Sequence, residues 1–486
     1  MPSQGEENRR RRNVIKGLGA AGITGLAGCT GGGEVGGQET TTTKKSSDQQ
    51  DFSDVTFRYW NIINIQNRNA RELSNKIIKE FEQETGATVQ VNFSGYTDLV
   101  GSKWRTAWAN NNYPVVYDNL TYLGGHLNHK VVPVSEYIDK FDDQTIQKYQ
   151  WIMDLMAKET YRGYQGSGLD RVYEIPFGLD VREPNVFRRD HFEKAGVSWE
   201  KNMPPKNYDQ LVSTMKTVMN NGPATTGYQV YGVPHDWSDV QLLPWQIANA
   251  GADGLYVDEK AREPNMDKQN WIKTFRDYVN VFRKHNLCGP QTPQMSDEKT
   301  VPNIISGRWS GGSMDPFNHP SLARQAPQLA NSGKVQYTTQ YKTNNLQKGG
   351  FIWSTVGLAL TEKPPGVSQN KWNRKQEAAI GLMKKFLEKD LQRQSWNGFG
   401  TLPARKDVWG DLERKPHGLL DVLTTMAEET NYSVSARPGI AQIYSTLTGP
   451  TAQKALRGNI SPEEACKQIA KDSRQLMKES PFPSEK

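Results

Sequence analysis

The chain has no run of 18 apolar residues, although it is 486 residues long. A helix that crosses a bilayer needs about 20 such residues. We therefore expect the mature protein not to be integral to a membrane. The length is more than one compact core usually organises, which favours two domains or lobes.

The chain also lacks a large excess of positive or negative charge. The net charge is +7, and residues 1–28 carry five basic and two acidic side chains, which leaves about +4 on the rest of the chain. No block of five like charges follows residue 28. This mild, dispersed charge does not support nucleic-acid binding.

Reactive and metal-binding patterns are few. The sequence contains no G-x-S-x-G, H-E-x-x-H or G-x-x-x-x-G-K-[ST] motif, so we expect neither an enzyme nor a cofactor. His126 and His129 have the spacing of a metal pair but no third ligand nearby, and a solvated loop pair explains them better. Of the three cysteines, Cys288 and Cys466 could form a disulfide or remain two unpaired thiols.

The first 28 residues have the pattern of an export signal. Arg9–Arg12 precede a short, glycine-rich apolar stretch that is too short to span a bilayer. The run Arg11–Lys16 resembles a twin-arginine signal, and Leu26–Cys29 resembles a lipobox, which implies a lipid-carrying Cys29 as the first mature residue. The alternative is a disordered tail in which Cys29 is incidental. Gly17–Gly22 matches the dinucleotide fingerprint G-x-G-x-x-G, but no strand precedes it and we reject that interpretation.

Strand and helix patterns alternate beyond a Gly/Thr/Ser-rich segment, residues 29–53, which we interpret as a flexible tether. Residues 55–60 alternate as a strand does, residues 69–84 have apolar side chains at helical spacing, and residues 88–93 form a second strand pattern. A helix around 98–109 and a strand at 115–117 complete a βαβ rhythm, which predicts a mostly parallel sheet. Further helices are predicted over 208–219, 270–284, 374–388 and 462–477.

A series of short motifs gives a more specific indication. In chain order they are Glu80–Gly86, Tyr173–Asp180, Asn185–Asp190, Phe192–Gly196, Ile305–Arg308, Gly311–Met314, Gly400–Arg405 and Ser435–Pro438. Their order and spacing over residues 54–480 resemble the extracellular solute-binding proteins of the family 1 type, which are archaeal and bacterial receptors of carbohydrate ABC importers. The family usually has Pro-Asp before its third strand, whereas this chain has Pro114-Val115, so no role is carried over to that position.

The resemblance implies a fold and its boundaries. The fold class is α/β, with two lobes of the type II periplasmic-binding-protein kind that close on a solute by hinge motion. The N-lobe is expected from residues 54–178 and 347–401, and the C-lobe from residues 179–346 and 402–480. The implied partners are a sugar or oligosaccharide and the permease subunits of an ABC transporter, at the extracellular face of the cell membrane.

The resemblance also places candidate ligand-binding residues at strand ends and turns. A sugar cleft needs flat rings for apolar sugar faces and carboxylates or amides for hydroxyls. Any single tryptophan could instead be core packing. The expected set is Trp60, Asn61, Asp118, Asn119, Tyr122, Asp180, Trp237, Met314, Asp315, Trp353 and Arg437.

The predicted function is therefore a sugar receptor that leaves its ligand intact. A receptor for a phosphorylated polyol or another anion is the alternative, and it needs an arginine cluster at the cleft. A glycoside hydrolase is a third reading, since it also needs aromatic side chains plus two carboxyl groups.

Overall fold

The computed structural model describes residues 50–61, 68–93, 104–120, 131–181, 184–230, 257–258, 260–295, 299–339, 352–429, 432–433 and 435–482. The chain divides into two units, residues 1–49 and 50–486, and all described residues lie in the second. The signal, most of the tether and Cys29 are therefore outside the described residues, as are His126 and His129.

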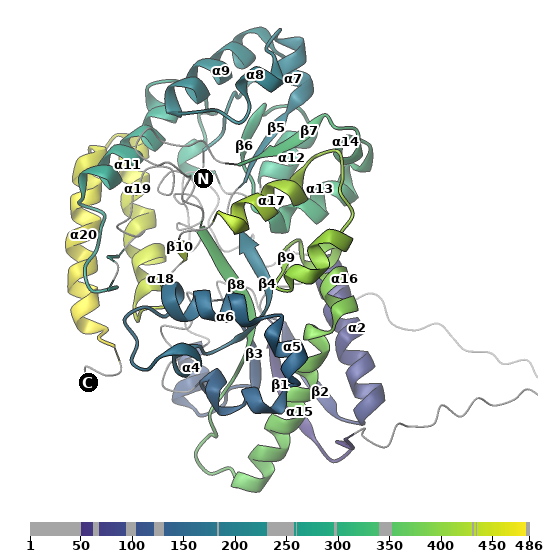
Figure 1. Ribbon diagram of the computed structural model, residues 1–486. Coiled ribbons are helices and arrows are strands. Elements are labelled where there is room, and N and C mark those ends of the chain that lie inside the picture. The colour runs from purple at the N-terminus through teal and green to yellow at the C-terminus, as the bar shows by residue number, and fades with distance from the viewer. Residues whose placement is uncertain are drawn as a thin grey trace, which may run out of the picture. The chain divides into compact units, whose positions relative to one another are not determined.

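The larger of two sheets has seven strands (Figure 1). Its order is β2-β1-β3-β8-β4-β9, with β10 also pairing with β8. The bounds are β1 Thr56–Asn61, β2 Thr88–Phe93, β3 Val116–Leu120, β4 Ile175–Val181, β8 Ile352–Leu360, β9 Leu402–Pro403 and β10 Tyr432–Ser433. The strands β1, β2 and β3 are parallel, as the βαβ rhythm predicts.

The prediction of a mostly parallel sheet is wrong for the other half of this sheet. Strand β8 inserts between β3 and β4 and runs antiparallel to both. It comes from more than 170 residues further along the chain, so no local rhythm could indicate its direction. The second sheet has three strands, β5 Asn185–Arg188, β6 Gly311–Ser313 and β7 Val335–Thr338, with both neighbours antiparallel to β5.

Helix α2 shows how local sequence dictates local structure. It spans Arg68–Thr85 and buries Leu73, Ile77, Ile78 and Phe81, the residues at helical spacing. It ends at Gly86, whose backbone has a φ of 76° and whose N–H bonds to the carbonyl of Glu82 at 2.8 Å. A left-handed residue after the last turn is the position that glycine fills without steric cost.

The other long helices lie where the sequence predicts them. These are α9 Tyr208–Asn221, α11 Gln269–Arg283, α15 Gln369–Leu387 and α20 Pro462–Glu479. Helices α15 and α16 (Lys389–Phe399) pack on α2, whereas α11 packs on α19 (Gly449–Arg457) and α20 (Figure 1). The shorter helices are α4 Trp104–Ala109, α5 Asp143–Gln147, α6 Gln150–Leu155, α7 Arg189–Lys194, α8 Trp199–Asn202, α12 Thr300–Ile305, α13 His319–Gln325, α14 Pro327–Asn331, α17 Leu419–Glu428 and α18 Ile440–Gln442.

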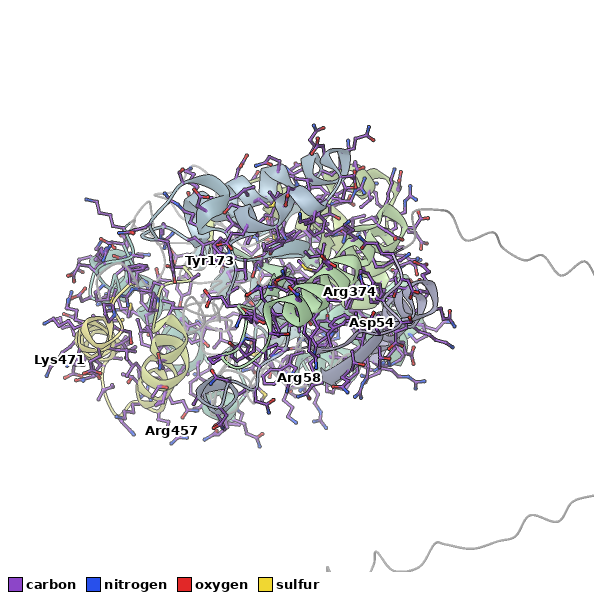
Figure 2. All side chains as sticks on the ribbon, turned by 90° about the horizontal axis from the view of Figure 1, so that it is seen from below. Asp54, Arg58, Tyr173, Arg374, Arg457 and Lys471 are labelled. Atoms are coloured by element: carbon purple, nitrogen blue, oxygen red, sulfur yellow. The ribbon has the colours of Figure 1, made fainter. Side chains whose placement is uncertain are left out.

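Arg374 on α15 fixes the start of the described chain. Its Nη2 donates to the backbone carbonyl of Asp51 and lies 3.4 Å from Oδ1 of Asp54, beside it in Figure 2. Its guanidinium also lies over the ring of Phe52, 4.6 Å from the ring centre. The last residues of the predicted tether, Asp51 and Phe52, are thus held against α15 rather than flexible, and Phe52 is 1% exposed.

Both described cysteines, Cys288 and Cys466, are free thiols, so the second of the two sequence readings applies. None of the helices in the described ranges is long and apolar enough to cross a membrane. The same ranges hold no group of three His, Cys, Asp or Glu side chains arranged for a metal ion.

Candidate ligand site at the edges of the two sheets

Six of the residues that the sequence predicts for the site lie on strands of the larger sheet, near the ends of β1, β3 and β4 and the start of β8. Strands β1, β3 and β4 run in the same direction, and β8 and β10 run against them. The last residues of the first three strands therefore lie at the same edge as the first residues of β8 and β10. In the pairing register, Asp180 is opposite Ser354, and Trp353 is opposite both Val181 and Ser433. Ligands of open α/β sheets bind outside the carboxyl ends of the strands.

The smaller sheet presents a matching edge. Asn185 begins β5 while Ser313 ends β6 and Thr338 ends β7, and the antiparallel pairing puts all three at one end. Val181 at the end of β4 and Asn185 are four residues apart, a span of at most about 14 Å along an extended chain. The two edges therefore approach each other where the chain passes from one sheet to the other.

Asn61 and Asp118 take part in a buried network at the edge of the larger sheet. The carboxylate of Asp118 accepts a hydrogen bond from the Tyr59 hydroxyl, and Nδ2 of Asn61 donates to the same hydroxyl oxygen at 2.9 Å. Both residues are almost fully buried, since Asp118 is 0% exposed and Asn61 is 1% exposed. Burial, followed by the charge of Asp118, holds the pKa of Tyr59 well above its ordinary value, so Tyr59 stays a donor.

Asp180 and Trp60 are also enclosed. Asp180 lies on β4, which is buried along its whole length, and Trp60 on β1 is 5% exposed. A contact of either residue with a solute stays a prediction.

Met314 and Asp315 follow β6 and shape the turn after it. The backbone N–H of Met314 donates to the carbonyl of Pro184 at 3.1 Å, which ties β6 to the start of β5. Asp315 accepts from the backbone N–H of Phe317 at 2.9 Å and thereby caps the short helical turn Pro316–Asn318. Both side chains are buried, at 0% and 4% exposure.

Arg437 has an internal role. Its Nε donates to the carbonyl of Ala261 at 2.9 Å, its Nη1 donates to Pro438, and its Nη2 lies 3.5 Å from the carbonyls of Met477 and Ser480. The residue is 3% exposed, and burial lowers its pKa to about 10. These bonds fasten the segment before α18 to the end of α20. The described hydrogen bonds of the Arg437 guanidinium all go to backbone carbonyls, and the group also lies 5.4 Å from the ring centre of Phe482.

The remaining predicted residues cannot be placed in the same detail. Asn119 and Trp353 lie on β3 and β8, but their side chains are outside the described part of the chain, as are Tyr122 and Trp237 entirely.

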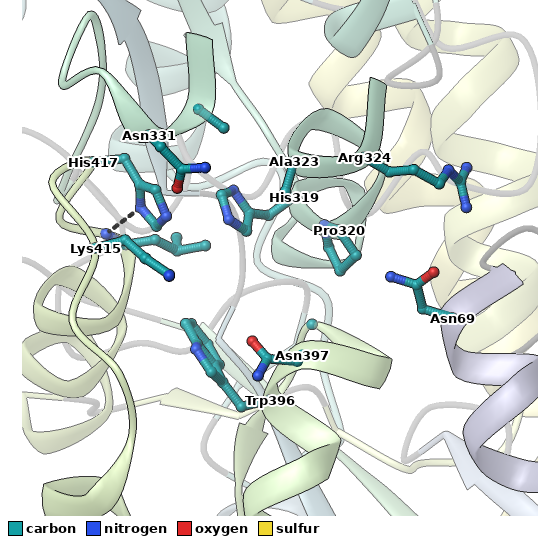
Figure 3. Close-up of a pocket in the computed structure, with 13 residues that line it drawn as sticks. Asn69, His319, Pro320, Ala323, Arg324, Asn331, Trp396, Asn397, Lys415 and His417 are labelled. Carbon is teal, nitrogen blue, oxygen red and sulfur yellow. Dashed lines mark hydrogen bonds between the residues drawn. The ribbon is translucent and has the colours of Figure 1, made fainter. Parts of the chain in front are cut away.

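A cavity that the sequence does not predict lies beside the turn after β6 (Figure 3). It holds about 240 Å³. One wall comes from α2 and α16, which pack together, and the other comes from α13, α14 and the segment before α17. The lining side chains include Asn69, His319, Arg324, Asn331, Trp396, Asn397, Lys415 and His417.

Two histidines lie against each other in this cavity, with their ring planes tilted by 56°. The rings of His319 and His417 are 4.3 Å apart between centres. Nδ1 of His319 lies 2.9 Å from the hydroxyl oxygen of Tyr337, and Nδ1 of His417 accepts the backbone N–H of Leu419 at 3.1 Å. Burial lowers the pKa of His319 to about 3 and that of His417 to about 4, the latter with help from the charge of Lys415. Both rings are therefore neutral at neutral pH.

Comparison with known families decides the class of protein. The family model described as bacterial extracellular solute-binding protein matches residues 76–417. The chain belongs to this family.

Solved structures of such proteins share the fold. The GacH receptor of Streptomyces glaucescens, solved unliganded and with acarbose, aligns with a TM-score of 0.69 at 15% identity, over 87% of this chain and 98% of its own. Maltose-bound MalE3 of T. maritima gives the same score and identity, over 87% and 100% of the two chains. A solute-binding protein of Thermotoga lettingae bound to tagatose gives 0.65 at 19% identity, over 87% and 100%. The fold is thus the two-lobed α/β fold of the periplasmic binding proteins.

Within this solute-binding protein, sequence reasoning missed the cavity beside α13. Its side chains come from five separate segments, so no spacing in the sequence brings them together. The one local signal is Trp396-Asn397, which comes just before the motif Gly400–Arg405 at the boundary between the expected lobes.

Proposed function

We propose that the protein is the receptor of an ABC importer that captures a sugar or oligosaccharide by hinge closure and delivers it to the permease. The observation that carries the proposal is the edge of the larger sheet where β4 ends and β8 begins, with Asp180 opposite Ser354 and Trp353 opposite Val181. Trp60 lies near the end of β1, two strands away from β8 in the same sheet. Proteins of the same fold bind maltose, acarbose and tagatose. Rings and carboxylates at one edge suit a ligand with apolar faces and hydroxyl rims.

The two sheets support the proposed lobes. Every strand of the smaller sheet falls within residues 179–346, and strands β1–β3 and β8 fall within 54–178 and 347–401. Strand β4 passes through the proposed crossing at Gly178 and pairs there with Pro403 of β9. A Cβ atom at Gly178 would lie 2.8 Å from Oγ1 of Thr401, so the two crossing segments are in close contact.

Within this proposal the residues divide into two groups. Trp60, Asp180 and Trp353, together with Tyr122, Asn119 and Trp237, are proposed to contact the solute. Asn61, Asp118, Met314, Asp315 and Arg437 are proposed to shape the surrounding backbone, because their described bonds are internal.

The proposal includes export and anchoring. Residues 1–28 would direct twin-arginine export, and Cys29 would carry lipid that holds the protein at the outer face of the membrane. Replacing Cys29 with Ser and fractionating the cells tests this part. Loss of the protein from the membrane fraction supports the anchor, whereas unchanged membrane association with no lipid on the parent protein overturns it.

A panel of sugars tests the binding function. A ligand that binds only the folded protein increases its free energy of unfolding by RT ln(1 + [L]/Kd). The unfolding temperature rises as a consequence. At least one neutral sugar should raise the midpoint and be recovered unchanged. Conversion of that sugar to products would instead favour a glycoside hydrolase.

A further inference from the structure

We infer that the cavity between α13 and α16 is a second binding site, for a small polyhydroxylated anion such as a sugar acid. It is distinct from the proposed solute site at the edge of the larger sheet, because none of the residues proposed to contact the solute lines it. Nothing in the inference requires the proposed transport function to hold.

The charge of the lining selects the class of ligand. Arg324 and Lys415 line the cavity and no Asp or Glu does. Lys415 is paired with Glu413, which lies outside the cavity, whereas no ion pair is described for Arg324 anywhere in the described ranges. A second cavity, of about 450 Å³ beside α15, is lined by acidic and basic side chains together and shows no such bias.

The neutral side chains suit hydroxyl groups. Asn69, Asn331 and Asn397 each offer an amide donor and acceptor, and Trp396 offers a flat apolar face. The Nδ1 atom of His417 is occupied as an acceptor by Leu419, so its ring carries the proton on Nε2 and donates from that side. Figure 3 shows Arg324 and Lys415 toward opposite ends of the cavity, with the histidines, Trp396 and the asparagines between them.

The floor of the cavity is formed where the end of α16 meets the start of α13. Gly400 ends α16 with a φ of 74°, and a Cβ atom there would lie 2.8 Å from the carbonyl oxygen of Pro316 and 3.1 Å from Cδ of Pro320. The end of α16 and the start of α13 are therefore in direct contact.

The imidazole resonances of His319 and His417 give a direct readout. The chain has seven histidines, so these resonances can be assigned with the variants His319→Gln and His417→Asn. The probes are D-glucuronate and D-glucose at matched ionic strength, because they differ chiefly in one carboxylate. Glucuronate should shift both resonances in a saturable way and raise the unfolding midpoint, whereas glucose should do neither at the same concentration.

A matched pair of double variants isolates the charges. Replacing Arg324 and Lys415 with Gln should weaken glucuronate binding at least tenfold. Replacing Arg457 and Lys471 with Gln removes the same net charge from exposed positions on α19 and α20 (Figure 2) and should leave binding unchanged. The inference is overturned if glucuronate leaves both resonances in place, if glucose binds equally well, or if the two double variants bind glucuronate alike.

Discussion

Tyr59 on β1 donates a hydrogen bond to the carboxylate of Asp118 on the adjacent strand β3. The bond joins two parallel strands just before the edge where they end. It sits beneath the proposed solute site and leaves Asp118 buried within the protein. The relationship makes Asp118 a part of the scaffold that positions the ends of both strands.

Replacing Tyr59 with Phe removes that donor while keeping the ring that packs edge-on against Phe386. We expect the free energy of unfolding to fall by about 1–3 kcal/mol, because the buried carboxylate of Asp118 loses this hydrogen-bond donor. Urea unfolding measures the change. The control is Tyr208→Phe, whose hydroxyl donates to the carbonyl of Asp277 in a partly buried position, so its removal should cost less. Equal losses in the two variants would contradict a special role for the buried pair.

Gly400 is expected to tolerate no side chain. Its φ of 74° and the 2.8 Å approach to the Pro316 carbonyl both oppose a Cβ atom, so Gly400→Ala should cost about 2 kcal/mol or more. Gly410→Ala is the matched control, because nothing lies within 4 Å of its Cβ position. The midpoints of thermal unfolding should separate the two variants, and similar midpoints would show that the contact between α16 and the turn before α13 is loose.

The stability of the protein should depend on pH through His417. Its pKa is about 4 when folded and about 6.5 when unfolded, so between these values the unfolded chain binds the proton first. The contribution is complete above pH 6.5 and is lost as the pH falls toward 4, by about 3 kcal/mol in all. His417→Asn keeps an acceptor for Leu419 but cannot titrate, so unfolding measured across this range should show a shallower slope. An unchanged slope would mean that His417 is accessible to protons in the folded state.

Local elements could be predicted from the sequence, but distant pairings could not. The apolar spacing and Gly86 set the length of α2, and β2 begins and ends where its pattern does. The antiparallel insertion of β8 depends on contacts with β3 and β4 far away in the chain.

The candidate site shows the same limit. Strand ends could be predicted to lie at one edge, because side chains after parallel strands must gather there. Which of these side chains bonds within the protein depends on tertiary packing. Asp118 accepts a hydrogen bond from Tyr59, and Arg437 donates to the carbonyls of Ala261 and Pro438. The sequence motif predicts Arg437 as a ligand contact, and it could not predict that the described hydrogen bonds of its guanidinium go to backbone carbonyls.

Asp180 carries the sharpest prediction for the solute site. Removing a carboxylate that bonds a buried hydroxyl should weaken sugar binding tenfold to a hundredfold, which is about 1.5–3 kcal/mol. Calorimetry of Asp180→Ala and the more conservative Asp180→Asn measures this, with circular dichroism to establish that both fold. Asp472→Asn, on the exposed face of α20, should bind as the parent does. Parental affinity in a folded Asp180→Ala protein would remove Asp180 from the site.

The central claim is that this protein binds a neutral sugar and returns it intact. Isothermal titration calorimetry of the purified protein against mono-, di- and oligosaccharides, followed by chromatography of the recovered sugars, tests it most directly. The account predicts saturable binding of at least one sugar and its complete recovery unchanged. No binding across the panel, or loss of the bound sugar to hydrolysis products, would contradict it.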